Sequence, residues 1–180
     1  MKLPQRIFVS GIHTQIGKTY CSAVITKALA ADYFKPFQCG DLHSSDSAFV
    51  RAMVKSSQCH IHPEWQQFEF PAAPYFSFWK EHGGFPEWTT QEIKSALPQT
   101  HNRLIIEGAG GLLVPVTENI MMANLSAIWN ASIILVIQPY LGAINHTLLS
   151  LSYLASEKIP VLGWILNNTE ETQFAEEWER

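Results

Sequence analysis

Three consecutive residues, Gly17, Lys18 and Thr19, have the clearest capacity for chemistry in this sequence. They end a segment that starts at Gly11, after the apolar run Ile7 to Val9, and they precede a helical pattern. A strand, a loop bounded by glycines and a helix, in this order, are typical of a phosphate-binding loop. Glycine lets the backbone approach a phosphate, the amides of a helix start attract anions, lysine neutralises the terminal phosphates, and a threonine hydroxyl suits Mg²⁺. We therefore expect a nucleotide to be bound by Gln15, Ile16, Gly17, Lys18 and Thr19.

Two acidic residues are candidates to hold Mg²⁺ together with Thr19. Glu107 follows the apolar run Leu104 to Ile106, at the predicted end of a strand. Asp46 lies at the start of a predicted helix, a position that is equally typical of a helix cap. Carboxylates and hydroxyls are oxygen ligands of the kind that Mg²⁺ prefers. Small residues after Glu107 let a nucleotide come close to the backbone, so we also expect nucleotide contacts from Gly108, Ala109 and Gly110.

Other reactive side chains have weaker support. Lys35 precedes Pro36 at a strand end beside the phosphate-binding loop, which favours anion binding over an ordinary surface position. Cys39 would need a partner base to act as a nucleophile, and the sequence shows no histidine partner for it. The segment Cys59 to His62 lacks a second pair of ligands at a recognisable spacing, so we interpret it as a surface loop and not as a metal site.

Short apolar runs alternate with helical patterns, which predicts an α/β fold: a parallel sheet flanked by helices on both faces, similar to P-loop nucleotide hydrolases. In such sheets ligands bind beyond the carboxyl ends of the strands, where the polar clusters of this sequence lie. Residues 56–88 are expected to be irregular, with one short helix. The expected strands are 7–10, 32–40 with its following loop, 103–106, 112–116, 132–137 and 160–166. The expected helices are 18–31, 44–54, one from 89, 119–129, 142–156 and a polar tail at 170–180.

Local signals give further detail on these elements. Pro36 should make the second strand short or irregular. Ser44 or Ser45 is the expected cap of one helix, and Thr89 has Glu92 three residues later, the spacing of a capping box.

The composition sets the class of protein. With 180 residues, we expect one domain over 1–180. The chain is 47% hydrophobic and 16% charged, as in soluble globular proteins. Its net charge of −4, without a run of Lys or Arg, argues against nucleic-acid binding, and the sequence has no apolar run of membrane-spanning length. Three widely spaced cysteines argue against a disulfide framework and indicate a reducing compartment, which we interpret as the cytoplasm.

Six segments together resemble the dethiobiotin synthetase family, and they occur in the order found in that family. The five residues between Gly11 and Gly17, where the common phosphate-loop pattern has four, are also the form of this family. The resemblance covers nearly the whole chain, and the set is specific although no single segment is. The segments are Gly-Ile-His-Thr-Gln-Ile-Gly-Lys-Thr at 11–19, Phe-Lys-Pro-Phe-Gln-Cys-Gly at 34–40, Ser-Ser-Asp at 44–46, Glu-Gly-Ala-Gly-Gly-Leu-Leu-Val-Pro at 107–115, Gly-Ala-Ile-Asn-His at 142–146 and Gly-Trp-Ile-Leu-Asn-Asn at 163–168.

The resemblance implies an ATP-dependent ligase of biotin biosynthesis, which converts diaminopelargonic acid, CO₂ and ATP into dethiobiotin, ADP and phosphate. It implies that Lys18 and Lys35 are catalytic, because they neutralise the carbamate and phosphoryl oxygens. Mg²⁺ would be held by Thr19, Asp46 and Glu107, and the nucleotide base would be bound by Asn167. The substrate's reacting end would contact Thr14 and Cys39. Its carboxylate would reach Gly142, Ala143, Ile144 and Asn145 in the partner subunit of a homodimer.

The sequence also departs from the family's usual pattern. Cys39 stands where serine is usual, and His13 and Gln15 stand where acidic residues are usual. Family members continue past the position of Arg180 with a further strand, helices and a base-binding loop, so relaxed nucleotide selectivity is expected.

Two rival interpretations stay open. One is another P-loop enzyme, such as a partition ATPase or a cobyrinate amidase-type synthetase, although the extra lysine of partition ATPases is missing between Gly11 and Gly17. The other is a shortened paralogue that binds a nucleotide or a partner without turnover. The presence of Lys18, Lys35 and the acidic pair opposes it, since phosphoryl transfer needs these charges.

Overall fold

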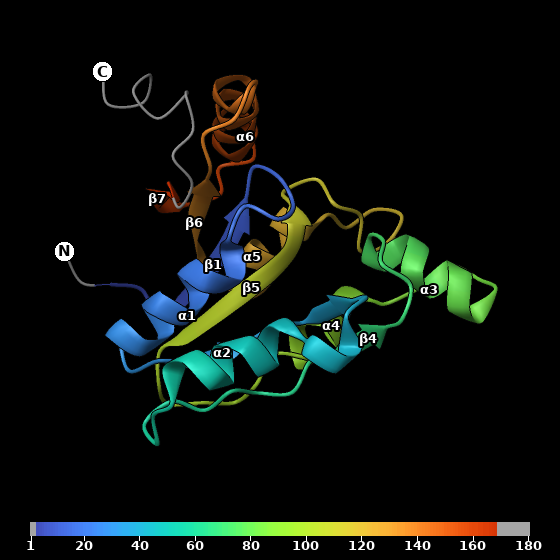
Figure 1. The fold of residues 1–180 in the computed structure, drawn as a ribbon. Coiled ribbons are helices and arrows are strands. Elements are labelled where there is room, and N and C mark those ends of the chain that lie inside the picture. The colour runs from blue at the N-terminus through green and yellow to red at the C-terminus, as the bar shows by residue number, and fades with distance from the viewer. Residues whose placement is uncertain (1–2, 169–180) are drawn as a thin grey trace.

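The chain folds as a five-stranded sheet with helices on both faces, a P-loop α/β architecture (Figure 1). The computed structural model describes residues 3–168. The strands are β1 (Arg6–Gly11), β2 (Asp32–Phe34), β3 (Phe37–Cys39), β4 (Gln66–Phe68), β5 (Leu104–Gly111), β6 (Ser132–Ile137) and β7 (Val161–Leu166). The helices are α1 (Lys18–Ala28), the 3₁₀ turn η1 (Leu42–Ser44), α2 (Asp46–Val54), α3 (Pro74–His82), α4 (Thr90–Ser95), α5 (Met122–Ile128) and α6 (Ala143–Ser156).

The main sheet has the strand order β2-β5-β1-β6-β7, and every pairing within it is parallel. Strand β1 therefore lies in the middle, between β5 and β6. Because all strands run the same way, their carboxyl ends lie along one edge of the sheet. A separate two-stranded parallel sheet pairs β3 with β4, and in it Gln38 lies opposite Gln67.

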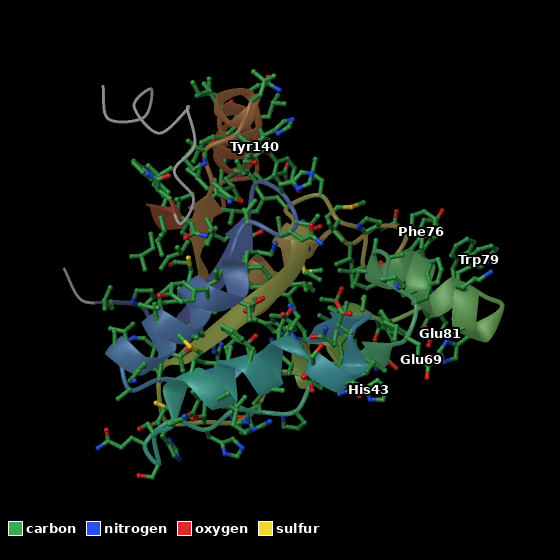
Figure 2. All side chains as sticks on the ribbon, in the orientation of Figure 1. His43, Glu69, Phe76, Trp79, Glu81 and Tyr140 are labelled. Atoms are coloured by element: carbon green, nitrogen blue, oxygen red, sulfur yellow. The ribbon has the colours of Figure 1, made fainter. Side chains whose placement is uncertain are left out.

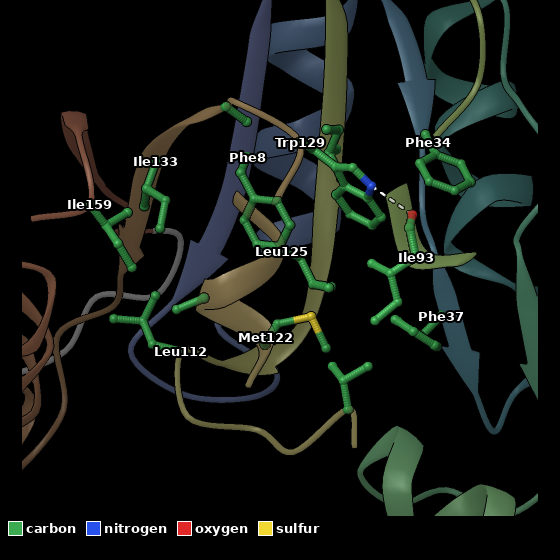
Figure 3. Packing of buried hydrophobic residues seen from close by; sticks show 14 of the residues in the cluster. Phe8, Phe34, Phe37, Ile93, Leu112, Met122, Leu125, Trp129, Ile133 and Ile159 are labelled. Atoms are coloured by element: carbon green, nitrogen blue, oxygen red, sulfur yellow. Dashed lines mark hydrogen bonds between the residues drawn. The ribbon is translucent and has the colours of Figure 1, made fainter. Parts of the chain in front are cut away.

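Alternate residues of the strands supply two hydrophobic layers. On one face, Ile7 and Val9 of β1 pack with Cys21 of α1 and Val50 of α2. On the other face the cluster draws on α4, α5 and α6 as well as on the strands, and Figure 3 shows how its side chains meet. Helices on both faces explain why these strands are continuously apolar and do not alternate with polar residues.

Most of the predicted elements are confirmed. Strands 7–10, 132–137 and 160–166 and the helices starting near 18, 44, 89, 119 and 142 are all present within one to three residues of their expected starts. The Ser45 side chain accepts a hydrogen bond from the Ala48 amide, as an N-cap does, and Thr89 forms the expected capping box with Glu92. Cys21, at 6% exposed, is a core residue.

Three expectations about extended segments need correction. The strand expected over 32–40 is split into β2 and β3, which join different sheets on either side of Pro36. The strand expected over 103–106 starts at Leu104 and continues to Gly111, which pairs with Gly11 of β1 after a shift in register. Within the extended piece expected over 112–116, Leu112 and Leu113 form a turn, closed by a 3.3 Å hydrogen bond from the Val114 amide to the Gly111 carbonyl, and Pro115 forms an isolated antiparallel bridge with Met121.

Residues 56–88 contain more order than the sequence suggests. The one short helix expected there is α3, and the additional element is the strand β4, which is too short to show a period in the sequence. The expected local packing cluster is present: the rings of Trp65 and Trp88 lie 5.0 Å apart and both contact Phe37. Phe76 and Trp79, however, extend outward from α3 and are about half exposed (Figure 2).

Two further expectations concern the rest of the chain. The polar tail expected at 170–180 lies outside the described residues. Among residues 3–168, no helix has the length and apolar character needed to cross a membrane.

Trp129 lies within the larger hydrophobic cluster and offers a test of how packing there stabilises the fold. Its indole nitrogen donates to the Ile93 carbonyl at 2.9 Å, and its ring contacts Phe8 and Phe34. Trp129→Ala should lower the free energy of unfolding by about 3–5 kcal/mol in urea denaturation, because it opens a cavity in the core. The matched control is Trp164→Ala, at a site 57% exposed, which should cost about 1 kcal/mol or less. Equal losses from the two variants would contradict the packing described here.

Candidate active site

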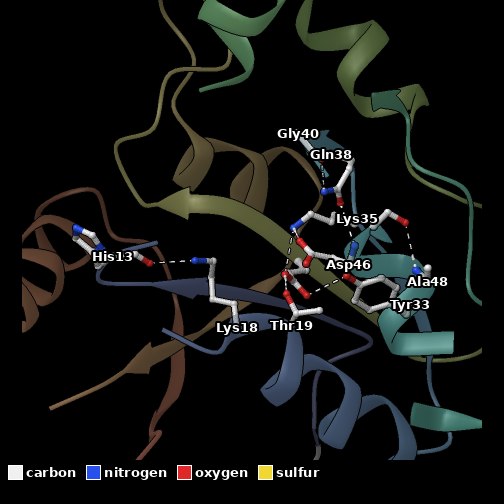
Figure 4. A network of polar contacts seen from close by, with 11 residues as sticks. His13, Lys18, Thr19, Tyr33, Lys35, Gln38, Gly40, Asp46 and Ala48 are labelled. Atoms are coloured by element: carbon white, nitrogen blue, oxygen red, sulfur yellow. Dashed lines mark hydrogen bonds and ion pairs between the residues drawn. The ribbon is translucent and has the colours of Figure 1, made fainter. Parts of the chain in front are cut away.

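The carboxyl ends of β1, β2 and β5 open onto a cavity of about 700 Å³, a volume in the range of ligand pockets. Residues from the phosphate-binding loop, from the segment around β3, from the start of α2 and from the end of β5 line it, as Figure 4 shows for the polar ones. The predicted site residues that line the cavity are Thr14, Gln15, Gly17, Lys18, Thr19, Lys35, Cys39, Asp46, Glu107, Ala109 and Gly110.

Glu107 is the most heavily bonded side chain of this cavity. It is 1% exposed, and it accepts hydrogen bonds from Thr19 Oγ1 at 2.8 Å, Tyr33 OH at 2.9 Å and Lys35 Nζ at 3.1 Å. These partners come from α1 and from the segment Tyr33 to Lys35, so the Glu107 carboxylate connects its own strand β5 to two other segments. Thr19 and Lys35 share Oε1, whereas Tyr33 alone holds Oε2.

Lys35 lies between two carboxylates. Its ammonium is 2.6 Å from Asp46 Oδ2 and 3.1 Å from Glu107 Oε1 (Figure 4). Burial alone would lower the pKa of Lys35, but the Glu107 and Asp46 carboxylates raise that pKa above its ordinary value. Burial works to raise the pKa of Asp46, but Lys35 outweighs it and lowers that pKa. Lys35 and Asp46 are therefore both charged at neutral pH.

Lys18 is the second cation of the cavity. Its ammonium donates to the His13 carbonyl at 3.0 Å, which places it across the phosphate-binding loop. Burial and the charge of Lys35 lower the pKa of Lys18 to about 8, although Glu107 and Asp46 act in the opposite direction. The Lys18 ammonium is therefore mostly charged at pH 7 and loses its proton near pH 8 when no anion is bound.

Gly17 has to be glycine for two structural reasons. Its φ of +81° lies in the left-handed region, and a Cβ there would come 2.1 Å from the Asn167 amide nitrogen. Asn167 follows β7, and its side chain donates to the Ile16 carbonyl at 2.9 Å. Asn167 thus supports the phosphate-binding loop from behind, and its predicted contact with a nucleotide base stays a prediction.

Several predicted site residues do not line the cavity. Ile16 is buried in the core next to α1. Gly108 packs against the core, because a Cβ there would come 2.9 Å from the Phe8 ring and 3.2 Å from Met122. Among the residues that the structure describes, the cavity lining also excludes Asn167 and the start of α6, where Gly142, Ala143, Ile144 and Asn145 lie.

Sequence analysis missed two polar residues of the site. Tyr33 is fully buried, and burial together with the Glu107 charge raises its pKa well above the ordinary value, so it remains a hydrogen-bond donor. A signal was available, because Tyr33 lies two residues before Lys35, and such residues of an extended segment face the same side. Gln38 lines the cavity, and it contacts Gly40 and Asp46 because the loop between them folds back over its side chain, which the sequence does not reveal.

The remaining cysteine and histidine candidates have other surroundings. Burial raises the pKa of the Cys39 thiol to about 11, so Cys39 is protonated at neutral pH and is a poor nucleophile. The segment Cys59 to His62 is not a simple surface loop: the Tyr33 amide donates to the His60 carbonyl, and the His62 amide donates to the Tyr33 carbonyl, both at 2.9 Å.

The oxygen atoms of the cavity fit a magnesium ion shared with a nucleotide. Thr19 Oγ1, Asp46 and Glu107 all approach the Lys35 region, and hydroxyl and carboxylate oxygens are hard ligands. Within residues 3–168, His, Cys, Asp and Glu do not gather in groups of three or more that could hold a metal. Mg²⁺ is commonly bound by one or two carboxylates together with phosphates and water, so the residues present are sufficient.

Comparison with known proteins gives the family. Residues 5–179 match the model of a family described as an AAA domain. A curated relative from Chlamydia pneumoniae, named ATP-dependent dethiobiotin synthetase BioD, is 36% identical over 97% of this chain and 75% of its own length. Proteins of the same name from Agrobacterium fabrum and Brucella ovis are 38% and 42% identical, over 93% and 88% of this chain and 77% and 72% of their own lengths.

This chain belongs to the dethiobiotin synthetase family. The resemblance carried by the six sequence segments is therefore confirmed, and so is the P-loop α/β fold. Residues from four of the six segments, 11–19, 34–40, 44–46 and 107–115, line one cavity.

Lys18 should make nucleotide binding depend on pH. In the nucleotide-free protein its pKa is about 8, so the ammonium is charged below pH 8 and neutral above it. Affinity for ADP with Mg²⁺ should fall as pH rises through 8, by up to about tenfold per pH unit if one proton is linked to binding. Isothermal titration between pH 7 and 9.5 measures this.

Two variants serve as comparisons for this pH dependence. Lys18→Met should bind ADP weakly and without the step near pH 8. Lys27→Met, which removes an exposed lysine from the same helix, should keep the wild-type profile. If the wild-type affinity for ADP stays constant between pH 7 and 9.5, the charge of Lys18 does not contribute to phosphate binding.

Proposed function

We propose that this chain is an ATP-dependent dethiobiotin synthetase, which closes the ureido ring of dethiobiotin from diaminopelargonic acid, CO₂ and ATP during biotin biosynthesis. The observation that carries this proposal is the position of Lys35. In a chain of this family, the paired Lys35 ammonium lies on the wall of the same cavity as the phosphate-binding loop. A nucleotide phosphate and a second anionic group can both be neutralised there.

The reaction would proceed in three steps. One substrate amine attacks CO₂ and loses a proton, which gives a carbamate. A carbamate oxygen then attacks the γ-phosphorus of ATP, and ADP leaves. The second amine attacks the carbonyl carbon of this mixed anhydride, phosphate leaves with the electrons of the broken C–O bond, and a proton is released as the ring closes. Negative charge develops on oxygen in each step, so the chemistry mainly requires positioning and neutralisation.

The residues have separate tasks in this scheme. Lys35 would neutralise the carbamate, because its ammonium is fixed by Asp46 and Glu107. Lys18 would follow the γ-phosphate as it is transferred, since, among residues 3–168, its ammonium is hydrogen-bonded to the His13 carbonyl and to no carboxylate. Thr19, Asp46 and Glu107 would hold Mg²⁺, which neutralises β- and γ-phosphate oxygens when bound. Thr14 and the protonated thiol of Cys39 would line the substrate's reacting end.

We further propose that the active form is a cytoplasmic homodimer, with Gly142 to Asn145 of one subunit receiving the substrate carboxylate of the other. The support is an apolar surface on and beside α6. Ile144, Leu148 and Leu149 are each about half or more exposed, and nearby Leu141 is 83% exposed. Exposed apolar residues gathered in this way are typical of a protein interface.

Phosphate release tests the proposed function. The purified protein is assayed with Mg²⁺, bicarbonate and ATP, with and without diaminopelargonic acid, and then with CTP and GTP in place of ATP. Release should require the diamine. Lys35→Met should reduce it by about a hundredfold or more, because a charge that stabilises the transition state is lost.

The controls separate catalysis from folding. Lys27→Met should leave phosphate release unchanged, and circular dichroism should show that Lys35→Met is folded. Phosphate release that does not depend on the diamine would contradict the proposal and indicate a different ATPase. No release with any nucleotide, from folded wild-type protein, would indicate a family member that binds without turnover.

The dimer proposal has its own test. Leu149→Lys should give a monomer by analytical ultracentrifugation, because it places a charge in the apolar surface, and turnover should fall by at least about tenfold while ADP binding is retained. Val24→Lys changes an apolar residue that is 47% exposed on α1, away from this surface, and should stay dimeric and active. A fully active Leu149→Lys monomer would refute a shared substrate site.

A further inference from the structure

The side chain of Gln38 connects the two ends of a loop that carries part of the active site. Gln38 is 5% exposed and lines the cavity. Its Nε2 donates to the Gly40 carbonyl at 2.9 Å, and its Oε1 accepts from the Asp46 amide at 3.2 Å (Figure 4). Both ends of this amide are therefore used, in a buried position where a missing partner would be costly.

The loop between these two contacts has an unusual backbone. Gly40 and Asp41 both have positive φ angles, of +76° and +52°, and the short turn η1 follows. Such a backbone is less favourable for Asp41 than for glycine, so contacts from outside the loop have to stabilise it. The Gln38 amide supplies two of them.

The loop matters more for the position of the Asp46 carboxylate than for that of the Glu107 carboxylate. Glu107 is buried and bonded to three side-chain donors, whereas the Asp46 side chain is 35% exposed and pairs with Lys35. Asp46 is also the first residue of α2. The position of its carboxylate is therefore set largely by where the backbone of α2 begins, and the Gln38 Oε1 holds the amide at that point.

We propose that Gln38 is a positioning residue for the magnesium-nucleotide site, because it fixes the start of α2 so that the Asp46 carboxylate stays in reach of Lys35 and of a bound cation. This inference rests on the proposed function, in which Asp46 holds Mg²⁺. Gln38 itself acts through Asp46. Residues that orient a metal ligand in this way typically contribute about ten- to a hundredfold to metal affinity or activity.

Gln38→Met tests the proposal, because methionine keeps the length and unbranched shape of the side chain but removes both hydrogen bonds. ADP binding is measured by isothermal titration with Mg²⁺ and again with EDTA. The gain in ADP affinity that Mg²⁺ provides should shrink by about tenfold or more. The metal-free affinity should stay within about twofold of wild type, since the phosphate-binding loop is untouched.

A readout without metal or turnover accompanies this titration. Amide hydrogen exchange by NMR should become faster at Asp46 in Gln38→Met, whereas the Ala48 amide, which Ser45 holds, should change little. The matched control is Gln67→Met, at the position opposite Gln38 in the two-stranded sheet, where the side chain is exposed and bonds to Glu64. The control should leave the magnesium-dependent gain and the Asp46 exchange rate unchanged.

The outcomes separate the alternatives. An unchanged magnesium-dependent gain in Gln38→Met would overturn the proposal, and so would a parallel loss of metal-free and metal-bound affinity. If Gln38→Met does not fold, Gln38→Asn, which keeps the amide but shortens it by one methylene, is judged by the same two readouts. Wild-type protein that binds Mg²⁺ and ADP but shows no diamine-dependent phosphate release would refute the proposed function and leave the role of Gln38 intact.

Discussion

Lys35 is a buried residue, 4% exposed, and much of the structure depends on keeping its charge paired. A buried charge without partners costs several kcal/mol, and removal of one partner of a buried pair costs about 3–5 kcal/mol. The fold meets this requirement from three directions. Strand β2 leads into Lys35, the neighbouring strand β5 delivers Glu107, and the start of α2 delivers Asp46. Because β2 lies beside β5 in the sheet, Glu107 comes close enough to Lys35 to compensate its buried charge.

The charges of the site nearly cancel before any ligand arrives. Lys18 and Lys35 line one cavity together with Asp46 and Glu107. The lowered pKa of Lys18 means that the two carboxylates do not fully offset the burial of its charge and the repulsion from Lys35. A nucleotide with its cation would bring charges of both signs. Its phosphates would then favour the charged form of Lys18, whereas Lys35 keeps its proton without them. The two lysines therefore differ in character although both line the same cavity.

The sequence reveals those parts of the site that are set within one short segment. The phosphate-binding loop, Lys35 and Glu107 follow from residue types at strand ends, and the caps at Ser45 and Thr89 follow from local spacing. For Tyr33, the spacing to Lys35 indicates the side that it faces but not its hydrogen bond to Glu107. The role of Gln38 and the pairing of β3 with β4 do not follow from the sequence, since each depends on segments that meet only in the folded chain. For the same reason Gly108, predicted to face a nucleotide, proves to be constrained by Phe8 and Met122 in the core.

The contact between Asn167 and the Ile16 carbonyl has a consequence for how the protein is made. The two residues are 151 positions apart, so Asn167 is synthesised 151 residues after the loop residue that it supports. The loop gains this support only after β7 has emerged from the ribosome and docked beside β6. Contacts of such long sequence separation form slowly. While the intervening residues are being made, a nascent chain therefore carries the characteristic loop without Asn167 behind it.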